Sequence, residues 1–347
     1  VKFGKFTNSA TVPNADTIVG GSGNDTISIT TALSNGTSID LGAGSNQLVL
    51  GNFANTGTVS NVNTLTGGTG ADTITFGAAI SNASINLGGG NDTLTLANAT
   101  NSGTVSNIRT VAGGTGNDTI TLGSALSNTI SVDLGAGANK LTLNSGANTG
   151  TVTNVATLIG GAGIDLITLG SGMTNGSVSL GVAADKLTLA AGGNTLTVAN
   201  VTSIVGGGGG DTVTLGTATT NGSINLVGGA SSVLLGNFAN TATVSNTESI
   251  VGGSSNDTIT LGSALSNSVQ LDLGAGKNTL TVGAFTNTGT VNNVNTLIGG
   301  TGADSITLGT ALVSGSVNLG SGNDTLTLGN FSNSATIANV KTLVGGT

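Results

Sequence analysis

The stretch from Gly113 to Ile159 reads GGTGNDTITLGSALSNTISVDLGAGANKLTLNSGANTGTVTNVATLI, and close copies of it follow one another along the whole chain. Its opening glycine pair recurs every 46 or 47 residues, starting at Gly20, Gly67, Gly113, Gly160, Gly206, Gly252, Gly299 and Gly345. Each copy holds two similar halves, here GGTGNDTITL and LGAGANKLTL. A fixed period of this length is typical of solenoids, so we expect each half to form one coil.

Within each half, apolar residues alternate with polar ones, as in Thr119-Ile120-Thr121-Leu122. This two-residue period is typical of a strand with one buried face, and helical spacing is absent. Threonine, valine and isoleucine favour strands, while the glycine clusters favour tight turns. The sequence therefore predicts an all-β parallel β-solenoid of about 14–15 coils that alternate between 20–21 and 26 residues. We expect a single continuous solenoid of double-coil repeats over residues 1–347.

Composition excludes several classes of function. The 347 residues include 61 glycines, 15 acidic and seven basic residues, and no cysteine, histidine, tryptophan or tyrosine. Disulfides, thiolate metal sites and histidine-based zinc or proton-transfer sites are therefore excluded. The basic residues are scattered singly in a chain of net charge -8, so we expect no nucleic-acid partner. No apolar run is long enough to predict a transmembrane segment. The remaining oxygen ligands suit hard cations such as calcium.

Four segments carry a resemblance to a known family: GGSGNDTISI from Gly20, GGTGADTITF from Gly67, GGTGNDTITL from Gly113 and LGSGNDTLTL from Leu319. They resemble the glycine-rich nonapeptides of repeats-in-toxin (RTX) proteins. That family's motif, G-G-x-G-x-D-x-U-x, winds into a parallel β-roll and binds calcium through aspartates and turn carbonyls. Typical members carry a metal-binding turn on both sides of each coil, whereas this chain shows one per coil. The resemblance therefore implies calcium along one edge only.

One position after the glycine-rich turns is held mostly by aspartate. These candidate calcium ligands are Asp25, Asp72, Asp92, Asp118, Asp165, Asp185, Asp211, Asp257, Asp304 and Asp324, interrupted by Asn46, Asn139, Ser231 and Asn278. Carboxylates stacked one coil apart repel by roughly 1 kcal/mol in water, and a divalent cation turns that repulsion into attraction. We expect calcium first along the runs Asp72-Asp92-Asp118 and Asp165-Asp185-Asp211 and at the pair Asp304-Asp324. The alternative is that each aspartate accepts hydrogen bonds from turn amides, as asparagine and serine also do.

Two asparagine positions are more uniform than the aspartate position. The first is Asn8, Asn55, Asn101, Asn148, Asn194, Asn240, Asn287 and Asn333, and the second is Asn14, Asn61, Asn107, Asn154, Asn200, Asn246, Asn293 and Asn339. Stacked amides of equivalent coils can hydrogen-bond to one another and to backbone groups at corners, so we expect structural asparagine ladders. Contact with a glycan or another ligand is the functional alternative.

Threonine pairs such as Thr73/Thr75, Thr93/Thr95 and Thr119/Thr121 are expected on the outer face of one sheet. A regular grid of hydroxyl groups is compatible with ordering water, which makes ice binding or an adhesin-type binding face a rival function. The simpler interpretation is that threonine is a good exposed strand residue. Leu166, Gln47 and Lys140 interrupt the grid.

These observations together favour a secreted, extracellular or cell-surface structural protein. We expect a rod, a surface-layer or matrix filament component, or an adhesin stalk. The acidic residues lie in a repeated row in which no pair is distinguished, so no enzyme is expected. Calcium-dependent folding after export is what the RTX resemblance implies. End-to-end or lateral self-association is expected, with cell-surface or matrix polysaccharide as a further contact.

Overall fold

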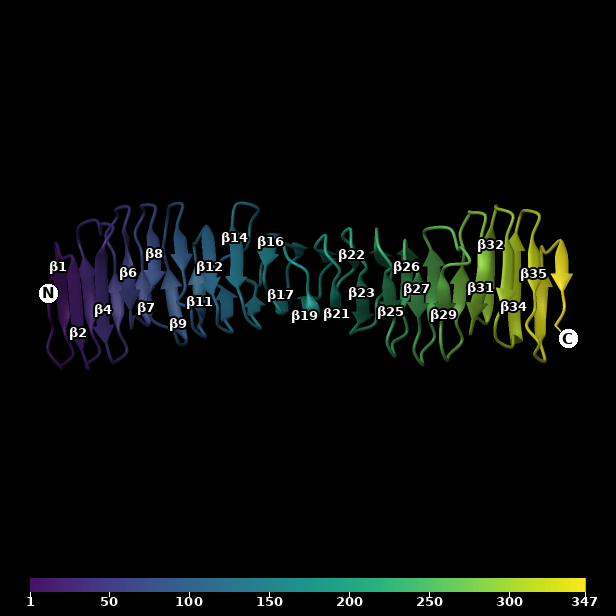
Figure 1. Cartoon of the computed structure of the whole chain (residues 1–347), viewed down its shortest axis with the longest axis horizontal. Coiled ribbons are helices and arrows are strands. Elements are labelled where there is room, and N and C mark those ends of the chain that lie inside the picture. The colour runs from purple at the N-terminus through teal and green to yellow at the C-terminus, as the bar shows by residue number, and fades with distance from the viewer. Residues whose placement is uncertain (347) are drawn as a thin grey trace. The chain divides into compact units, whose positions relative to one another are not determined.

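The computed structural model describes residues 1–346, in which it contains strands and no helix (Figure 1). The residues form two compact units, Val1–Ser171 and Gly172–Thr347. In each unit the chain winds as a parallel β-solenoid, with one odd-numbered and one even-numbered strand in each turn. The fold class expected from the sequence is therefore confirmed.

The first unit contains strands β1 to β18. Its odd-numbered sheet comprises β1 (Ser9–Val12), β3 (Thr26–Ile29), β5 (Gln47–Val49), β7 (Thr64–Thr66), β9 (Ala83–Asn86), β11 (Ser102–Ser106), β13 (Thr119–Leu122), β15 (Lys140–Thr142) and β17 (Thr157–Gly161). Its even-numbered sheet comprises β2 (Thr17–Gly21), β4 (Thr37–Gly42), β6 (Thr56–Ser60), β8 (Thr73–Phe76), β10 (Thr93–Thr95), β12 (Thr110–Gly114), β14 (Ser131–Gly135), β16 (Thr149–Thr153) and β18 (Leu166–Leu169).

The second unit contains strands β19 to β37. Its odd-numbered sheet comprises β19 (Thr174–Gly181), β21 (Thr195–Ala199), β23 (Thr212–Leu215), β25 (Ser232–Leu234), β27 (Ser249–Val251), β29 (Gln270–Asp272), β31 (Thr288–Asn292), β33 (Ser305–Leu308), β35 (Thr325–Thr327) and β37 (Thr342–Val344). Its even-numbered sheet comprises β20 (Lys186–Thr188), β22 (Ser203–Val205), β24 (Gly222–Asn225), β26 (Thr241–Ser245), β28 (Thr258–Leu261), β30 (Thr279–Thr281), β32 (Thr296–Gly300), β34 (Val313–Gly320) and β36 (Ser334–Ala338).

The turns are shorter and more numerous than the sequence suggests. Successive odd strands pair Ser9 with Thr26, Thr26 with Gln47, Gln47 with Thr64 and Thr64 with Ser84, which are offsets of 17, 21, 17 and 20 residues. The chain makes about 17 turns of about 20 residues each, instead of the 14–15 coils expected. The expected coil of 26 residues does not exist, because that spacing is one turn of 17 residues followed by a half turn.

One sequence repeat spans two and a half turns, because β3 follows Asp25 while β8, five strands later, follows the equivalent Asp72. Each turn holds two strands, so the half turn moves every second repeat from the odd-numbered sheet to the even-numbered one. Equivalent residues of consecutive repeats therefore lie on opposite edges of the solenoid. This corrects the expectation that the aspartates follow one edge, since a period of 46 or 47 residues fixes no whole number of turns.

The core lies between the two sheets of each unit. Ile27, Leu48, Leu65 and Ile85 are register partners in β3, β5, β7 and β9, and each is at most 1% exposed. Their polar neighbours along each strand point outward, as the two-residue period predicts. This thin core of aliphatic columns buries the strands without a deep globular interior.

Glycine is required where the turns approach most closely. An added Cβ at Gly113 would lie 2.2 Å from the Leu134 carbonyl oxygen of the next turn. Gly135 adopts a φ of +68°, a left-handed conformation that favours glycine. Stacking of successive turns at strand spacing thus leaves no room for side chains at these corners.

Candidate cation-binding turns

Polar residues of successive turns stack directly before the strands. We call each set of three an Asx stack: asparagine in the first place, aspartate in the second, and aspartate, asparagine or serine in the third. The first unit holds Asn8-Asp25-Asn46, Asn55-Asp72-Asp92 and Asn101-Asp118-Asn139, and the second holds Asn194-Asp211-Ser231, Asn240-Asp257-Asn278 and Asn287-Asp304-Asp324. In each unit the stacks alternate between the edges that lead into the odd-numbered and even-numbered sheets.

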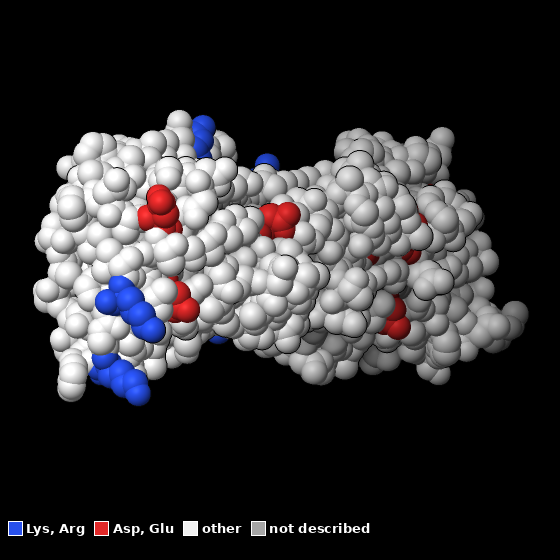
Figure 2. Space-filling view, turned by 60° about the vertical axis from the view of Figure 1, so that its left-hand side comes forward, with Lys and Arg blue, Asp and Glu red and all other residues white. Residues whose placement is uncertain are grey.

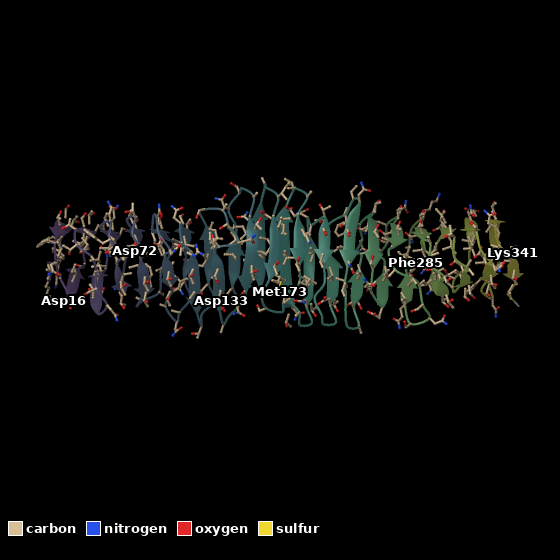
Figure 3. All side chains as sticks on the ribbon, turned by 90° about the horizontal axis from the view of Figure 1, so that it is seen from above. Asp16, Asp72, Asp133, Met173, Phe285 and Lys341 are labelled. Carbon is tan, nitrogen blue, oxygen red and sulfur yellow. The ribbon has the colours of Figure 1, made fainter. Side chains whose placement is uncertain are left out.

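The stack Asn55-Asp72-Asp92 shows the hydrogen bonds that its members share (Asp72 is labelled in Figure 3). The backbone N–H and side-chain Nδ2 of Asn55 donate to Asp72 Oδ1 at 2.9 and 2.8 Å. The backbone N–H of Asp72 in turn donates to Asp92 Oδ1 at 2.7 Å. Both aspartates are almost fully buried, at 0% and 1% exposure. Each turn therefore supplies a side-chain oxygen to the backbone amide of the turn before it.

The first-place asparagines also close their own turns. Asn55 Nδ2 donates to the carbonyl oxygens of Gly51 and Phe53, and Asn55 Oδ1 accepts from the Leu33 backbone N–H. Asn101 and Asn148 make the same bonds in their own turns. Equivalent asparagines do not bond to one another, because consecutive repeats place them on opposite edges. They are steps in mixed ladders with aspartate.

The second asparagine position bonds to residues one turn earlier. Asn61, Asn154 and Asn293 donate through Nδ2 to Asp40, Asp133 and Asp272 Oδ1 at 2.6 Å. Their φ angles of +57° are left-handed, a conformation that asparagine tolerates better than most residues. The other members with this conformation are Asn107, Asn200, Asn246 and Asn339. Asn14 does not share it, and it lies exposed before β2.

The structure divides the expected aspartate runs into pairs. Asp72 and Asp92 are neighbours on one edge, but Asp118 lies before β13 on the opposite edge. Asp211 lies before β23 and its neighbour in the next turn is Ser231. Asp304 and Asp324 are adjacent, with the Asp304 N–H 2.9 Å from Asp324 Oδ1. Asp165, in the first unit, accepts from Asn148 and from the Gly161 N–H, and Asp185 precedes β20 in the second unit.

Three further acceptors extend the stacks into a fourth turn. Asn63 and Asn295 accept from the backbone N–H groups of Asn46 and Asn278, and Glu248 Oε2 accepts from Ser231. Sequence reasoning missed them because the equivalent positions elsewhere hold Arg109, Ala156 and Lys341, which share no chemistry. The turn offset of 17 residues is the signal that would have found them.

The second-place aspartates each keep one carboxylate oxygen without a donor. Among residues 1–346, Oδ2 is buried and without a hydrogen-bond partner at Asp25, Asp72, Asp92, Asp118, Asp211, Asp257 and Asp304. A buried carboxylate oxygen without a partner is costly in a medium of low dielectric. A cation, or a proton, would remove that cost.

Burial perturbs two of these carboxyl groups. Burial raises the pKa of Asp257 above its ordinary value of 3.8, while hydrogen bonds from the Asn240 side chain and backbone oppose the rise. Burial likewise raises the pKa of Asp92, with the backbone hydrogen bond from Asp72 lowering it and the Asp72 charge raising it further. The ionised form of both groups is thus disfavoured when no cation is bound.

The raised pKa of Asp257 predicts a pH dependence of stability in calcium-free buffer. Because folded Asp257 holds its proton more tightly than the unfolded chain does, its contribution is present near pH 3.8 and is lost as the pH rises through the folded pKa. Urea unfolding of the wild type and Asp257→Asn across this window measures it. The free energy of the wild type minus that of the variant should rise as the pH falls. A difference that falls instead contradicts the pKa direction.

Comparison with known families agrees with this geometry. The family model of the RTX calcium-binding nonapeptide repeat, which spans four copies of the motif, matches residues 13–28, 60–78, 110–125, 244–264 and 291–310. Each match contains one second-place aspartate, namely Asp25, Asp72, Asp118, Asp257 and Asp304. The chain is an RTX-like β-solenoid protein. No curated protein and no solved structure matches the chain.

The second-place aspartates fit the calcium that RTX-like repeats imply. Their donor-free Oδ2 atoms are anionic oxygens, and the adjoining glycine turns add neutral carbonyl oxygens, which together are the ligands that calcium prefers. No three acidic side chains gather at one point within residues 1–346, so each site would rely on turn carbonyls as well as carboxylate. Calcium would supply positive charge to these turns.

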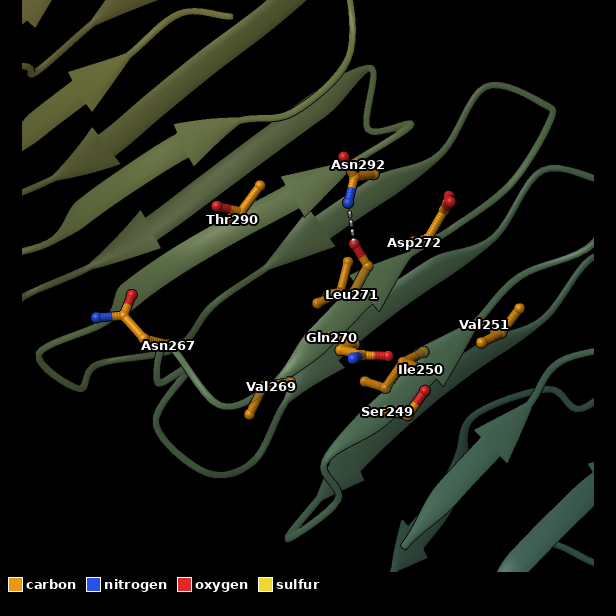
Figure 4. A pocket seen from close by; sticks show the side chains of 10 residues that line it. All are labelled: Ser249, Ile250, Val251, Asn267, Val269, Gln270, Leu271, Asp272, Thr290 and Asn292. Atoms are coloured by element: carbon orange, nitrogen blue, oxygen red, sulfur yellow. Dashed lines mark hydrogen bonds between the residues drawn. The ribbon is translucent and has the colours of Figure 1, made fainter. Parts of the chain in front are cut away.

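A cavity of about 520 Å³ lies beside β27, β29 and β31 of the second unit (Figure 4). Asn292 Nδ2 donates to the Leu271 carbonyl oxygen across it at 3.2 Å. Asp272 is the one titratable side chain that lines it, and its Oδ1 already accepts from the Gly274 N–H. A lone carboxylate offers no acid and base pair, which agrees with the non-catalytic appearance of the fold.

The outer faces of both sheets are largely neutral. Figure 2 shows acidic and basic side chains scattered singly among uncharged ones. The Thr73/Thr75 and Thr93/Thr95 pairs lie on the even-numbered sheet, whereas Thr119/Thr121 lies on the odd-numbered one, so the pairs do not share one face as expected. Within residues 1–346 no helix could cross a membrane.

Proposed function

We propose that this protein is a secreted, calcium-stabilised structural solenoid that forms a rod, a surface-layer or matrix filament, or an adhesin stalk, without a catalytic role. The observation that carries the proposal is the set of buried, donor-free aspartate oxygens at the RTX-like turns. Such turns are unstable without a cation and stable with one, so calcium outside the cell would favour the folded protein.

Repetition and neutrality support a structural role. The same turn recurs through both units, and the exposed strand residues are mostly small hydroxyl and amide side chains. RTX-like proteins are typically secreted. In an assembly, end-to-end or lateral contact between copies and contact with surface polysaccharide would use these extended neutral faces rather than a single pocket.

Calcium binding is tested by equilibrium dialysis of chelator-stripped protein against calcium chloride. We expect several ions per chain, and we expect Asp118→Asn to bind fewer because it removes the carboxylate charge of one second-place residue. Asp133→Asn is the matched control, since Asp133 is exposed and outside the Asx stacks. Absence of binding at millimolar calcium would contradict the proposal, as would equal binding by Asp118→Asn and the wild type.

Ice binding is the second candidate, favoured by one observation. Thr56, Thr73, Thr93 and Thr110 are register partners in β6, β8, β10 and β12, which gives a column of hydroxyl groups at strand spacing. The parallel column Thr58-Thr75-Thr95 ends at Ala112 and then Asp133, which narrows the regular area. An ice-recrystallisation assay distinguishes this function from a purely structural one.

A further inference from the structure

The third place of the Asx stacks is held by two kinds of residue in identical surroundings. Where it is asparagine, the side-chain Nδ2 donates to three carbonyl oxygens. Asn139 Nδ2 lies 3.1, 3.0 and 2.9 Å from the carbonyl oxygens of Leu134, Gly135 and Asn154. Asn46 and Asn278 make the equivalent three bonds in their own stacks. A cage of three carbonyls is thus closed around an NH₂ group.

Asp92 occupies the same place with an oxygen where the amide nitrogen belongs. Its Oδ1 accepts from the Asp72 backbone N–H at 2.7 Å, as Asn139 Oδ1 accepts from Asp118 at 2.8 Å. The planar carboxylate therefore directs Oδ2 towards the equivalent carbonyls, those of Leu87, Gly88 and Asn107. Asp92 Oδ2 is buried and has no hydrogen-bond partner.

The backbone of this cage is the same in both kinds of stack. Gly88 and Gly135 have φ angles of +85° and +68°, and Asn107 and Asn154 have φ angles of +53° and +57°. An added Cβ would lie 2.1 Å from the Gly68 carbonyl oxygen at Gly88, and 2.2 Å from that of Gly114 at Gly135. The carbonyl oxygens around Asp92 consequently face an oxygen instead of a donor.

We propose that the turn around Asp92 is a separate cation site, formed by Asp92 and the carbonyl oxygens of Leu87, Gly88 and Asn107, that takes a hard divalent cation. Asparagine in the third place of other stacks substitutes for that cation with its own NH₂ group. Asp324, with Leu319, Gly320 and Asn339, repeats the arrangement in the second unit. The RTX-type matches do not reach this turn, since none covers residues 79–109.

The charges around the site favour a divalent ion. The Asp72 and Asp92 carboxylates belong to adjacent turns, so the stack carries two negative charges. Arg109, in the following turn, donates its guanidinium to Asn91 Oδ1 at 3.2 Å and leaves Asp92 Oδ2 without a partner. An all-oxygen cage with carboxylate charge matches calcium better than a monovalent cation.

The test exchanges the two kinds of residue in the full chain. Asp92→Asn should bind one calcium ion fewer than the wild type in equilibrium dialysis, and its urea midpoint in chelator should rise because the NH₂ group closes the cage. Asn139→Asp should bind one ion more, and its midpoint in chelator should fall and recover with calcium chloride. Asp133→Asn (Asp133 is labelled in Figure 3) removes a carboxylate outside the stacks and should change neither count.

This inference rests on the proposed calcium binding, but the two can fail separately. Every second-place aspartate is retained in both exchanged variants, so calcium at those turns persists if only the third-place site is wrong. An unchanged ion count in both variants overturns the third-place site, as does a lowered midpoint for Asp92→Asn in chelator. A wild type that binds no calcium at millimolar concentration overturns the site together with the proposed function.

Discussion

Gly113→Ala is expected to destabilise the protein by more than about 3 kcal/mol, because the new methyl group has no space to occupy. Its Cβ would lie 2.2 Å from the Leu134 carbonyl oxygen and 2.5 Å from the Leu134 carbonyl carbon. Both atoms are backbone, so relief requires the two turns to separate. Separation would break the pairing of β12 with β14 and expose the Val111 and Val132 core contacts.

Gly192→Ala is the matched control for this substitution. Gly192 has no heavy atom within 4 Å of an added Cβ and does not have a left-handed φ. Its variant should unfold within about 0.5 kcal/mol of the wild type. Urea unfolding followed by far-UV circular dichroism measures both. Equal stabilities of the two variants would show that the turns are not stacked as closely as described.

Asn55→Ala is expected to cost about 3 kcal/mol or more, because one side chain serves three turns. Its removal leaves the buried Leu33 N–H without an acceptor and the Gly51 and Phe53 carbonyls without a donor. It also takes one of two Asn55 hydrogen bonds from the Asp72 carboxylate. Unsatisfied buried polar groups typically cost about 1–3 kcal/mol each, and more when charged.

The exposed neighbour Asn52 provides the control for Asn55. Asn52→Ala removes an amide from the same corner without opening the Asx stack, and it should change the free energy of unfolding by less than about 0.5 kcal/mol. Thermal unfolding of the two variants compares them directly. A cost for Asn55→Ala as small as that for Asn52→Ala would mean that water replaces the amide in the turn.

The fold class could be predicted from the sequence because two local signals agree. Alternation such as Thr119-Ile120-Thr121-Leu122 indicates strands, and doubled glycines at a fixed period indicate repeated turns. β13 and its neighbours follow that pattern. Local chemistry specifies strands and turns, and stacking equivalent turns then follows from burial of the aliphatic face.

The number of residues per turn could not be predicted, because sequence similarity reports equivalent surroundings rather than adjacent turns. Asp25 and Asp72 are equivalent in sequence, yet the neighbour of Asp72 in the next turn is Asp92 and in the previous turn is Asn55. The offset of 17 residues joins unlike residues, asparagine with aspartate, and is invisible to a search for self-similarity. The mixed composition of each stack, and hence the two kinds of third-place residue, follows from that offset.

The central claim is that cations stabilise the solenoid by neutralising its buried aspartates. The most direct measurement is the free energy of unfolding of the full chain, from urea unfolding followed by far-UV circular dichroism, in chelator and in increasing calcium chloride. The account predicts that this free energy rises with calcium concentration, since each ion binds the folded chain only. A free energy of unfolding that is the same in chelator and in millimolar calcium would contradict it, and the Asx stacks would then be hydrogen-bonded ladders alone.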